Sequence, residues 1–294
     1  MTRPSPYVRR HWLGAEIRRL RHEHGIRAEP LARAVGYPRQ QLSALENGHL
    51  GPDVDMVSAI CDYLTVGANR RTAIMDAASD GWARGWWTAH AERIGLRQGM
   101  YADLESGAAT ITEYALALFP GLLQTAAFAA ARIHSDVSRR SEAFDPEAAV
   151  AARTHRQQLL LAANGPQYEV VLDEFAIRRG AAEAHIVADQ LRHIIAVCAR
   201  HASVTVRVLP IGASIRSHSA PRSAYSIYRY RDVEGCVAVA VDTLTTDLIL
   251  TEQPDVDAYL SLHRRLKAAA LAPGPSLHLL GAAAQELSPR EGAA

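Results

Sequence analysis

The sequence predicts a multidomain protein, with a small all-α domain followed by a larger α+β domain that combines helices with a small sheet. Three observations predict this organisation: apolar residues recur at helical spacing through the first eighty residues, period-two strands appear only after Gly165, and the two parts differ in charge. We therefore expect the small domain to cover residues 1–80 and the larger domain to cover residues 81–294.

The composition is that of a globular protein, since 48% of the 294 residues are hydrophobic and 21% are charged. No apolar run reaches the ~18 residues of a membrane span, and no apolar signal core follows the basic start. We therefore expect a soluble, cytoplasmic protein without a membrane partner. Three scattered cysteines, Cys61, Cys198 and Cys236, argue against a disulfide framework or a zinc cluster, so we expect no metal and no cofactor.

Charge is distributed unevenly along the chain. Residues 1–50 hold nine arginines against four glutamates, which gives +5, whereas the whole chain carries +1 and the remainder therefore −4. A basic segment joined to a mildly acidic body is expected of a phosphate-binding module attached to a domain that does not itself bind nucleic acid. Taken alone, the same distribution is explained equally well by chance or by solubility.

Five helices are predicted in the small domain, from apolar spacing and from residues that begin or end helices. They are His11–His24, Ala28–Val35, Pro38–Glu46, a fourth helix after the cap Asp53 and a fifth helix capped by Asn69. Gly36 permits a tight turn between the second and third helices, and the small Ala32 lets them approach. The third helix then projects its first turn outward, which is the geometry that enters a DNA major groove.

In the larger domain, the aromatic segment Gly81–Trp87 is interpreted as the seam between domains, and helical segments are expected from there to about Ala163. After that the pattern alternates between strands and helices. The predicted strands are Tyr168–Asp173, Val204–Leu209, Ala224–Tyr230 and Cys236–Asp242, with a turn over Asp232–Gly235, and the predicted helices are Glu183–Arg200 and Pro254–Leu271.

Residues 12–64 resemble the lambda-repressor-like, or XRE-type, helix-turn-helix domain, down to Leu31-Ala32 and Leu45-Glu46-Asn47-Gly48. The resemblance implies an all-α lambda-repressor-like fold. It also implies a buried ion pair between an arginine of the first helix and the glutamate that ends the third. Arg21 and Glu46 occupy the matching positions, where loss of one partner would cost ~3–5 kcal/mol.

The family's base-reading positions fall on Arg39 and Gln40, with Ala44 one turn later. Arginine can form two hydrogen bonds with guanine and glutamine two with adenine, and each good pair discriminates by ~1–3 kcal/mol. We expect phosphate contacts, which set the register without reading sequence, from the polar residues Gln41, Ser43 and Asn47. The sequence departs from the family where the second helix begins, because Arg27 and Ala28 replace a polar cap and a phosphate-binding glutamine. Arg27 can still meet phosphate through its charge, but we expect the cap of this helix to be weakened.

The remainder, roughly residues 81–285, resembles the C-terminal domain of antitoxin-like regulators abundant in actinobacteria. The motifs that carry the resemblance are ARGWW at 83–87, PGLLQT at 120–125, VVLDE at 170–174 followed by Arg178-Arg179, VRVLP at 206–210 and TLTTDLILTE at 243–252. The resemblance implies pairing with a small companion protein.

Catalysis is not expected, because the chain has no G-x-S-x-G elbow and no H-E-x-x-H motif, and its single lysine, Lys267, is not part of a P-loop. Asp173-Glu174 is interpreted as the end of a strand and a helix cap. Glu183 with His185 is likewise interpreted as part of a helix cap, although both pairs could also suggest acid–base catalysis.

Two candidate contact regions remain open in the larger domain. Trp82, Trp86 and Trp87, together with Tyr225, Tyr228 and Tyr230, are candidates to line a ligand pocket; the alternative is that the tryptophan cluster packs the seam between domains. The loop 212–222, with Arg216, His218 and Arg222, is either a partner contact or a solvated loop.

Two functions fit these features. The first is a sequence-specific transcription regulator that binds double-stranded DNA as a homodimer on an inverted repeat, controlled by a small-molecule ligand or a companion protein. The second is an antitoxin-like module that holds a small partner protein, with DNA binding secondary.

Overall fold

The computed structural model describes residues 5–49, 51–80, 85–135, 142–231, 236–244 and 247–287. The chain divides into two compact units, and each is described by itself. The first unit consists of Met1–Ala89 together with two later segments, Asp103–Ala108 and Tyr230–Val237. The second unit consists of His90–Ala102, Ala109–Arg229 and Ala238–Ala294. In the described residues, no helix is both long and apolar enough to cross a membrane.

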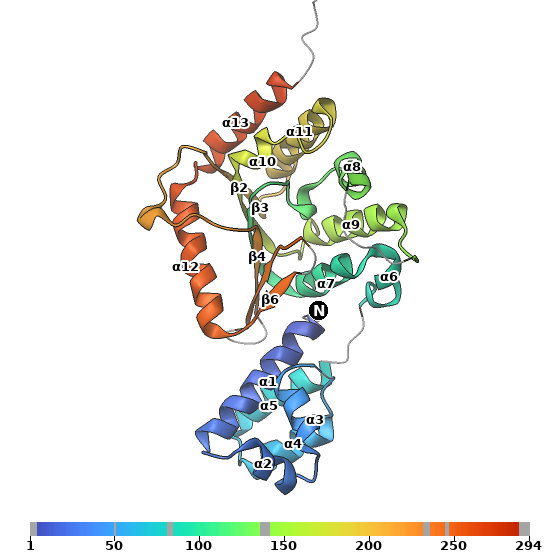
Figure 1. Ribbon diagram of the computed structural model, residues 1–294, viewed down its shortest axis with the longest axis vertical. Helices are drawn as coiled ribbons and strands as arrows, with labels where there is room; N and C mark the ends of the chain where they lie inside the picture. Colours follow the sequence, from blue (N-terminus) through green and yellow to red (C-terminus); the bar gives the residue numbers. More distant parts are fainter. Residues whose placement is uncertain are drawn as a thin grey trace, which may run out of the picture. The chain divides into compact units, whose positions relative to one another are not determined.

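The first unit is a bundle of short helices around one apolar core (Figure 1). Its main helices are α1 (Pro6–Glu23), α2 (Ala28–Ala34), α3 (Arg39–Glu46), α4 (Val54–Tyr63) and α5 (Ala68–Asp80). Each of the five contributes at least two buried apolar side chains to the core, among them Leu13, Leu31, Leu42, Ile60 and Ile74. The all-α fold predicted for this part of the chain is therefore present.

Helix boundaries differ from the prediction at two places, for local reasons. The first helix begins at Pro6 rather than near His11, because the Ser5 hydroxyl accepts a hydrogen bond from Val8 N and Pro6 is preorganised for the first turn. Asn69 is not the cap of α5, since Arg71 N already donates to Gly67 O at 2.9 Å and Asn69 lies inside the helix.

The second unit is built on a six-stranded sheet with the order β3-β2-β1-β4-β5-β6. The strands are β1 (Ala108–Ala115), β2 (Gln167–Asp173), β3 (Val204–Leu209), β4 (Tyr225–Tyr230), β5 (Val237–Val241) and β6 (Leu248–Leu250). Strands β1, β2 and β3 are mutually parallel, whereas β5 and β6 are antiparallel. The sheet is therefore mixed, and the larger part of the chain has the predicted α+β class.

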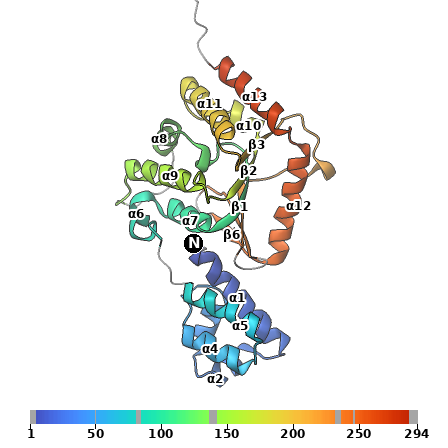
Figure 2. The same cartoon turned by 180° about the vertical axis from the view of Figure 1, so that it is seen from behind.

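Helices cover the sheet on both sides (Figures 1 and 2). One side carries α12 (Gln253–Ala269), and the other carries α7 (Leu96–Glu105), α8 (Ala126–Ser135) and α9 (Pro146–Leu160). At the β3 end, α11 (Ala184–Arg200) packs on α13 (Pro273–Glu286), and both contact β3. Shorter helices are α6 (Ala91–Ile94), α10 (Glu174–Arg178) and the 3-10 turns Thr88–His90, Gly121–Leu123 and Arg216–His218.

Helical segments dominate from residue 88 to about Ala163, as predicted, but the strand β1 within this region was not predicted. Ala108–Ala115 is a central strand because its backbone pairs with β2, in a register that joins Thr110 to Gln167 and Ala115 to Leu172. The three-residue β6 and the helix α13 were also not predicted. The turn expected over Asp232–Gly235 lies outside the described residues.

Candidate nucleic-acid interface

The link between α2 and α3 is a tight turn closed by backbone hydrogen bonds. Tyr37 N donates to Ala32 O at 2.9 Å and Gly36 N donates to Arg33 O at 3.3 Å, across the end of α2. Gly36 has φ +78°, a left-handed conformation that glycine adopts without a side-chain clash. Pro38 then caps α3 with an extended backbone. This sequence of helix, left-handed turn and helix directs α3 away from α2, as the turn residues predict.

The C-terminal end of α3 is held by a buried ion pair with α1. Arg21 Nε donates to Glu46 Oε1 at 2.6 Å and Arg21 Nη2 donates to Glu46 Oε2 at 2.9 Å, while Nη1 donates to Ile26 O at 3.1 Å. The two side chains are only 10% and 8% exposed. Hydrogen bonding to Glu46 raises the pKa of the Arg21 guanidinium. The structure thus brings together the two residues that the resemblance pairs, with both carboxylate oxygens occupied.

A glycine that the sequence reasoning missed sets the distance between α1 and α3. A Cβ atom at Gly14 would lie 2.5 Å from the carbonyl oxygen of Leu45 and 2.6 Å from that of Glu46. Both neighbours are backbone atoms, so no side-chain rotation could relieve the clash. The close packing fixes the axis of α3 at its rear end, next to the ion pair.

The first turn of α3 is exposed, opposite to this anchored end. Leu42 and Leu45 are buried in the core, whereas Arg39, Gln40 and Gln41 are exposed. Ala44, the further base-reading candidate, is partly buried. The exposed side chains offer a guanidinium and two amides on one short helix, which is the chemistry that reads base edges and binds phosphates.

The N-terminus of α3 also differs from that of α4 in its capping. On α4, the Asp53 carboxylate accepts hydrogen bonds from Asp55 N at 3.0 Å and Met56 N at 3.1 Å. On α3, Pro38 supplies no side-chain acceptor and no acidic residue lies in the first turn. The positive end of the α3 dipole is therefore not compensated by its own cap.

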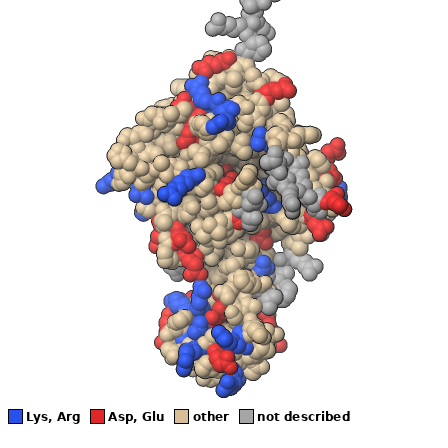
Figure 3. All heavy atoms as spheres, in the orientation of Figure 1, with Lys and Arg blue, Asp and Glu red and all other residues tan. Residues whose placement is uncertain are grey.

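The remaining phosphate candidates are exposed but make local contacts. Asn47 Nδ2 donates to Ser43 O at 2.7 Å, so these two candidates lie against each other at the end of α3. Arg27 caps α2 in an extended conformation without a side-chain hydrogen bond to the helix, in agreement with the weakened cap expected there. Basic side chains are visible over this helical unit, interspersed with acidic ones (Figure 3).

The described aromatic residues that the sequence offers for a ligand pocket do not line a common pocket. Trp82 lies outside the described residues. Trp86 and Trp87 pack edge to face with ring centroids 6.1 Å apart, and Trp87 hydrogen-bonds to Asp103 within the first unit. These contacts are those of packing residues. The three tyrosines are buried in β4, with Tyr225 and Tyr228 each 1% exposed, so their rings fill the interior instead of lining an open pocket.

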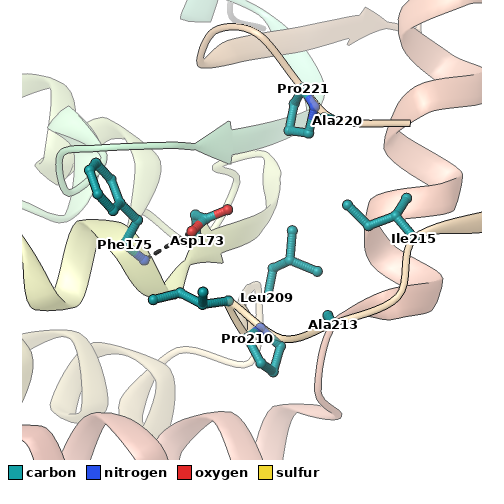
Figure 4. A pocket seen from close by; sticks show the side chains of 9 residues that line it. Asp173, Phe175, Leu209, Pro210, Ala213, Ile215, Ala220 and Pro221 are labelled. Carbon is teal, nitrogen blue, oxygen red and sulfur yellow. Dashed lines mark hydrogen bonds between the residues drawn. The ribbon is translucent and has the colours of Figure 1, made fainter. Parts of the chain in front are cut away.

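The second unit does contain a cavity, at a place the sequence reasoning did not single out. It has a volume of about 270 Å³ and is lined by Asp173, Phe175, Leu209, Pro210, Ile211, Ala213, Ile215, Ala220 and Pro221 (Figure 4). Four of these residues belong to the loop 212–222, which the sequence offers as a candidate partner contact. The predicted contact residues of that loop, Arg216, His218 and Arg222, are exposed and do not line the cavity.

Asp173 was interpreted as a strand end and helix cap, and the geometry matches that interpretation: it ends β2 and its Oδ1 accepts from Phe175 N at 2.9 Å. Glu183 caps α11, and its Oε2 lies 3.5 Å from His185 Nδ1, with both side chains exposed. The described residues contain no group of three or more histidine, cysteine or acidic side chains that could hold a metal ion.

Two family models match different parts of the chain. Residues 12–74 match the model of a helix-turn-helix domain, which covers most of α1, all of α2 to α4 and about half of α5, and supports a DNA-binding regulator. Residues 98–282 match the model of a domain of unknown function, DUF5753. No curated protein and no solved structure matches the chain. Because the second match spans more than half of its length, the chain belongs to the DUF5753 family, with a helix-turn-helix domain at its N-terminus.

Proposed function

We propose that the protein is a sequence-specific transcription regulator that reads operator DNA with the first turn of α3. The observation that carries the proposal is the contrast between the two ends of that helix. Its rear end is fixed by the Arg21–Glu46 pair, whereas Arg39 and Gln40 at the front are exposed. A rigid helix with free hydrogen-bonding side chains at its tip needs little rearrangement to enter a groove.

In this proposal, Arg39 and Gln40 contact base edges and the exposed polar residues around them contact phosphates. A single module reads few base pairs, so we propose a homodimer on an inverted repeat with half-sites about one helical turn apart. The DUF5753 domain has no catalytic role in this proposal. It controls DNA binding through a small-molecule ligand or a companion protein.

The test is binding of the full chain to labelled DNA from upstream of its own gene, with affinity measured over a series of salt concentrations. We expect the logarithm of the affinity to fall with a slope of ~0.9 per neutralised phosphate. The double variant Arg39→Ala, Gln40→Ala should lose roughly tenfold or more in affinity and should lose preference for the operator over random DNA.

A matched control removes the same two chemical groups from the other unit. Arg192 on α11 and Gln253 on α12 are both exposed, and the variant Arg192→Ala, Gln253→Ala should bind the operator like the unmodified chain. Equal operator preference in the α3 double variant and this control would refute the assignment of α3. Light scattering and operators with one or two half-sites test the dimer.

A second candidate, an antitoxin-like module that holds a small protein, is favoured by the loop that carries Arg216, His218 and Arg222. All three side chains are exposed, and Ser217 and His218 hold left-handed backbone angles, φ +62° and +51°. Co-purification from the native host tests it. A stoichiometric small partner that is lost on mutation of these three residues, combined with no salt-sensitive DNA binding, would favour this candidate over the first.

A further inference from the structure

We propose that the cavity beside Asp173 binds a small hydrophobic amine, whose cationic group pairs with the Asp173 carboxylate. This inference deepens the proposed function and rests on it for one consequence, that the amine is the signal to which the regulator responds. The binding itself follows from three features of the cavity: its place in the sheet, the chemistry of its lining and the conformation of the loop that forms its wall.

The cavity lies where two parallel strands end. Asp173 is the last residue of β2, Leu209 is the last residue of β3, and the two are partners in the register of the sheet. Ligands of open sheets with parallel strands bind beyond the carboxyl ends of those strands, where loops diverge and leave space. The volume of about 270 Å³ is slightly below the usual range of about 300–1,000 Å³ for ligand pockets, which restricts the occupant to a small molecule.

The lining combines one carboxylate with apolar side chains. Asp173 is the one charged residue among the nine that line the cavity, and it faces a wall of aliphatic and proline side chains from Leu209, Ile215 and Pro221 (Figure 4). An apolar molecule would be favoured by such walls, but it would leave the carboxylate without a cationic partner once water is displaced. A molecule with an apolar body and an ammonium group can pack against the apolar walls and pair with the carboxylate at the same time.

Neutral groups hold the Asp173 carboxylate in place. Tyr114 Oη donates to Oδ2 at 2.8 Å, and Phe175 N donates to Oδ1 at 2.9 Å. In the described part of the chain, Asp173 forms no ion pair. The carboxylate is thus oriented by hydrogen bonds while its negative charge is not cancelled. This arrangement favours a cationic ligand over a neutral or anionic one.

Two charged residues that follow Asp173 in the chain, Glu174 and Arg179, already have partners. Glu174 Oε2 accepts from Ile211 N at 3.1 Å and so fixes the start of the loop, while Glu174 Oε1 pairs with Arg178 at 3.3 Å. The Arg179 guanidinium lies 4.0 Å from the centre of the Phe175 ring, so this cation is positioned on an aromatic side chain.

The wall opposite Asp173 comes from a loop with an unusual backbone. Ala213, Ile215, Ala220 and Pro221 line the cavity, and between them Ser217 and His218 both have positive φ, at +62° and +51°. Two consecutive left-handed residues that are not glycine are uncommon and carry a conformational cost, which tends to be retained at ligand-binding sites. At these two residues the loop turns, and the residues on either side of the turn line the cavity beyond the strand ends.

The experiment is isothermal titration of the full chain, without DNA, with ligands that share a body and differ in charge. Tryptamine, tryptophol and indole-3-acetate form one set, and hexylamine, hexanol and hexanoate form the second. We expect at least one amine to bind about tenfold or more tightly than its alcohol, as charge-assisted hydrogen bonds predict, and more tightly still than its carboxylate. The proposal would be overturned if each amine bound with the same affinity as its alcohol or more weakly, or if neither amine bound at millimolar concentration.

Asp173→Asn removes the charge but keeps an acceptor that can cap α10. It should weaken amine binding roughly tenfold to a hundredfold and leave alcohol binding nearly unchanged. Asp189→Asn is the matched control, because Asp189 is an exposed carboxylate on α11 outside the cavity, and it should bind like the unmodified chain. An Asp173→Asn protein that binds the amine as tightly as this control would refute the pairing.

A second variant tests the cavity independently, in case Asp173→Asn does not fold. Ala220 lines the cavity and is exposed, so Ala220→Phe can be accommodated at the surface while its ring narrows the cavity. It should weaken the amine and its alcohol alike, and unchanged affinity for both would place the ligand elsewhere. Since these titrations contain no DNA, their failure leaves the role of α3 standing, and failure of operator binding leaves the amine measurements interpretable.

Discussion

Two regions of the molecule bury polar side chains in different charge states: the contact between α1 and the end of α3 buries an ion pair, and the centre of the sheet buries neutral groups. In the first region a full charge pair, Arg21 with Glu46, is buried, and the guanidinium donates three hydrogen bonds of 2.6–3.1 Å. In the second, neutral groups are packed together: Tyr225 Oη lies 3.3 Å from His263 Nδ1, and the Tyr225 ring packs on Tyr114 and Tyr259.

The difference predicts different sensitivities. A buried ion pair is most sensitive to loss of one partner, because the other charge is then left without compensation. A buried neutral imidazole is instead sensitive to acid, because protonation would place a charge among aromatic rings. Both regions stabilise the fold, so the comparison can be tested by measuring the free energy of unfolding.

The largest effect is expected for Glu46→Ala, which should lower the free energy of unfolding of the helical unit by about 3–5 kcal/mol. Chemical denaturation monitored by circular dichroism measures it. The double variant Arg21→Met, Glu46→Leu serves as the control, because it removes both charges and should recover much of the loss. If the single variant were as stable as the unmodified chain, the pair would not anchor α3.

The next effect is the acid sensitivity of the sheet region. Burial is the main reason why the pKa of His263 is lowered from 6.5 to about 4. As the pH falls, the imidazole is therefore protonated in the unfolded chain before it is protonated in the folded chain. The contribution of neutral His263 to the free energy of unfolding is fully present above pH 6.5 and is lost as the pH falls towards about 4. The loss should reach up to about 3 kcal/mol.

Denaturation curves recorded across this pH window, for the unmodified chain and for His263→Leu, measure that loss. The variant should show a flatter dependence of unfolding free energy on pH, because its side chain does not titrate. Parallel pH profiles would show that His263 is protonated equally in the folded and unfolded chains, and the contrast between the two regions would disappear.

A smaller effect is expected from the close approach of α1 to α3. Gly14→Ala places a methyl group against the carbonyl oxygens of Leu45 and Glu46, and it should cost about 1–3 kcal/mol through displacement of α1. Gly274→Ala is the control, since a Cβ there meets no atom within 4 Å. Equal stabilities of the two variants would mean that α3 is positioned by the ion pair without help from this packing.

The smallest changes in the free energy of unfolding are expected at two helix ends in the first unit, and they should have opposite signs. Gly36 and Thr65 both follow a helix and both have left-handed backbones, with φ +78° and +51°. Gly36→Ala should destabilise the unit by about 1 kcal/mol, whereas Thr65→Gly should stabilise it by up to about 1 kcal/mol, because a β-branched residue is strained there. Thermal denaturation compares them, and the same sign for both would refute the strain at Thr65.

Local signals in the sequence determined much of the first unit. The apolar spacing, Gly36 and Pro38 were sufficient to place α2, the turn and α3 within one or two residues, because helix ends depend on neighbouring residues in the chain. The Arg21–Glu46 pair was placed by family resemblance. Gly14 was not recognised, because its role depends on the backbone of α3, which lies about thirty residues further along the chain.

In the second unit, the sequence by itself determined the strands β2 to β5 and the helix α11, whose periodicity is strong. Only the tertiary structure decided the place of Ala108–Ala115 in the sheet: Thr110–Thr112 and Tyr114 are residue types that favour strands, but the hydrogen-bond partners that make this segment a strand lie on β2. The cavity was likewise decided by tertiary structure: parallel pairing aligns Asp173 with Leu209, and the loop after β3 then encloses the space beyond them.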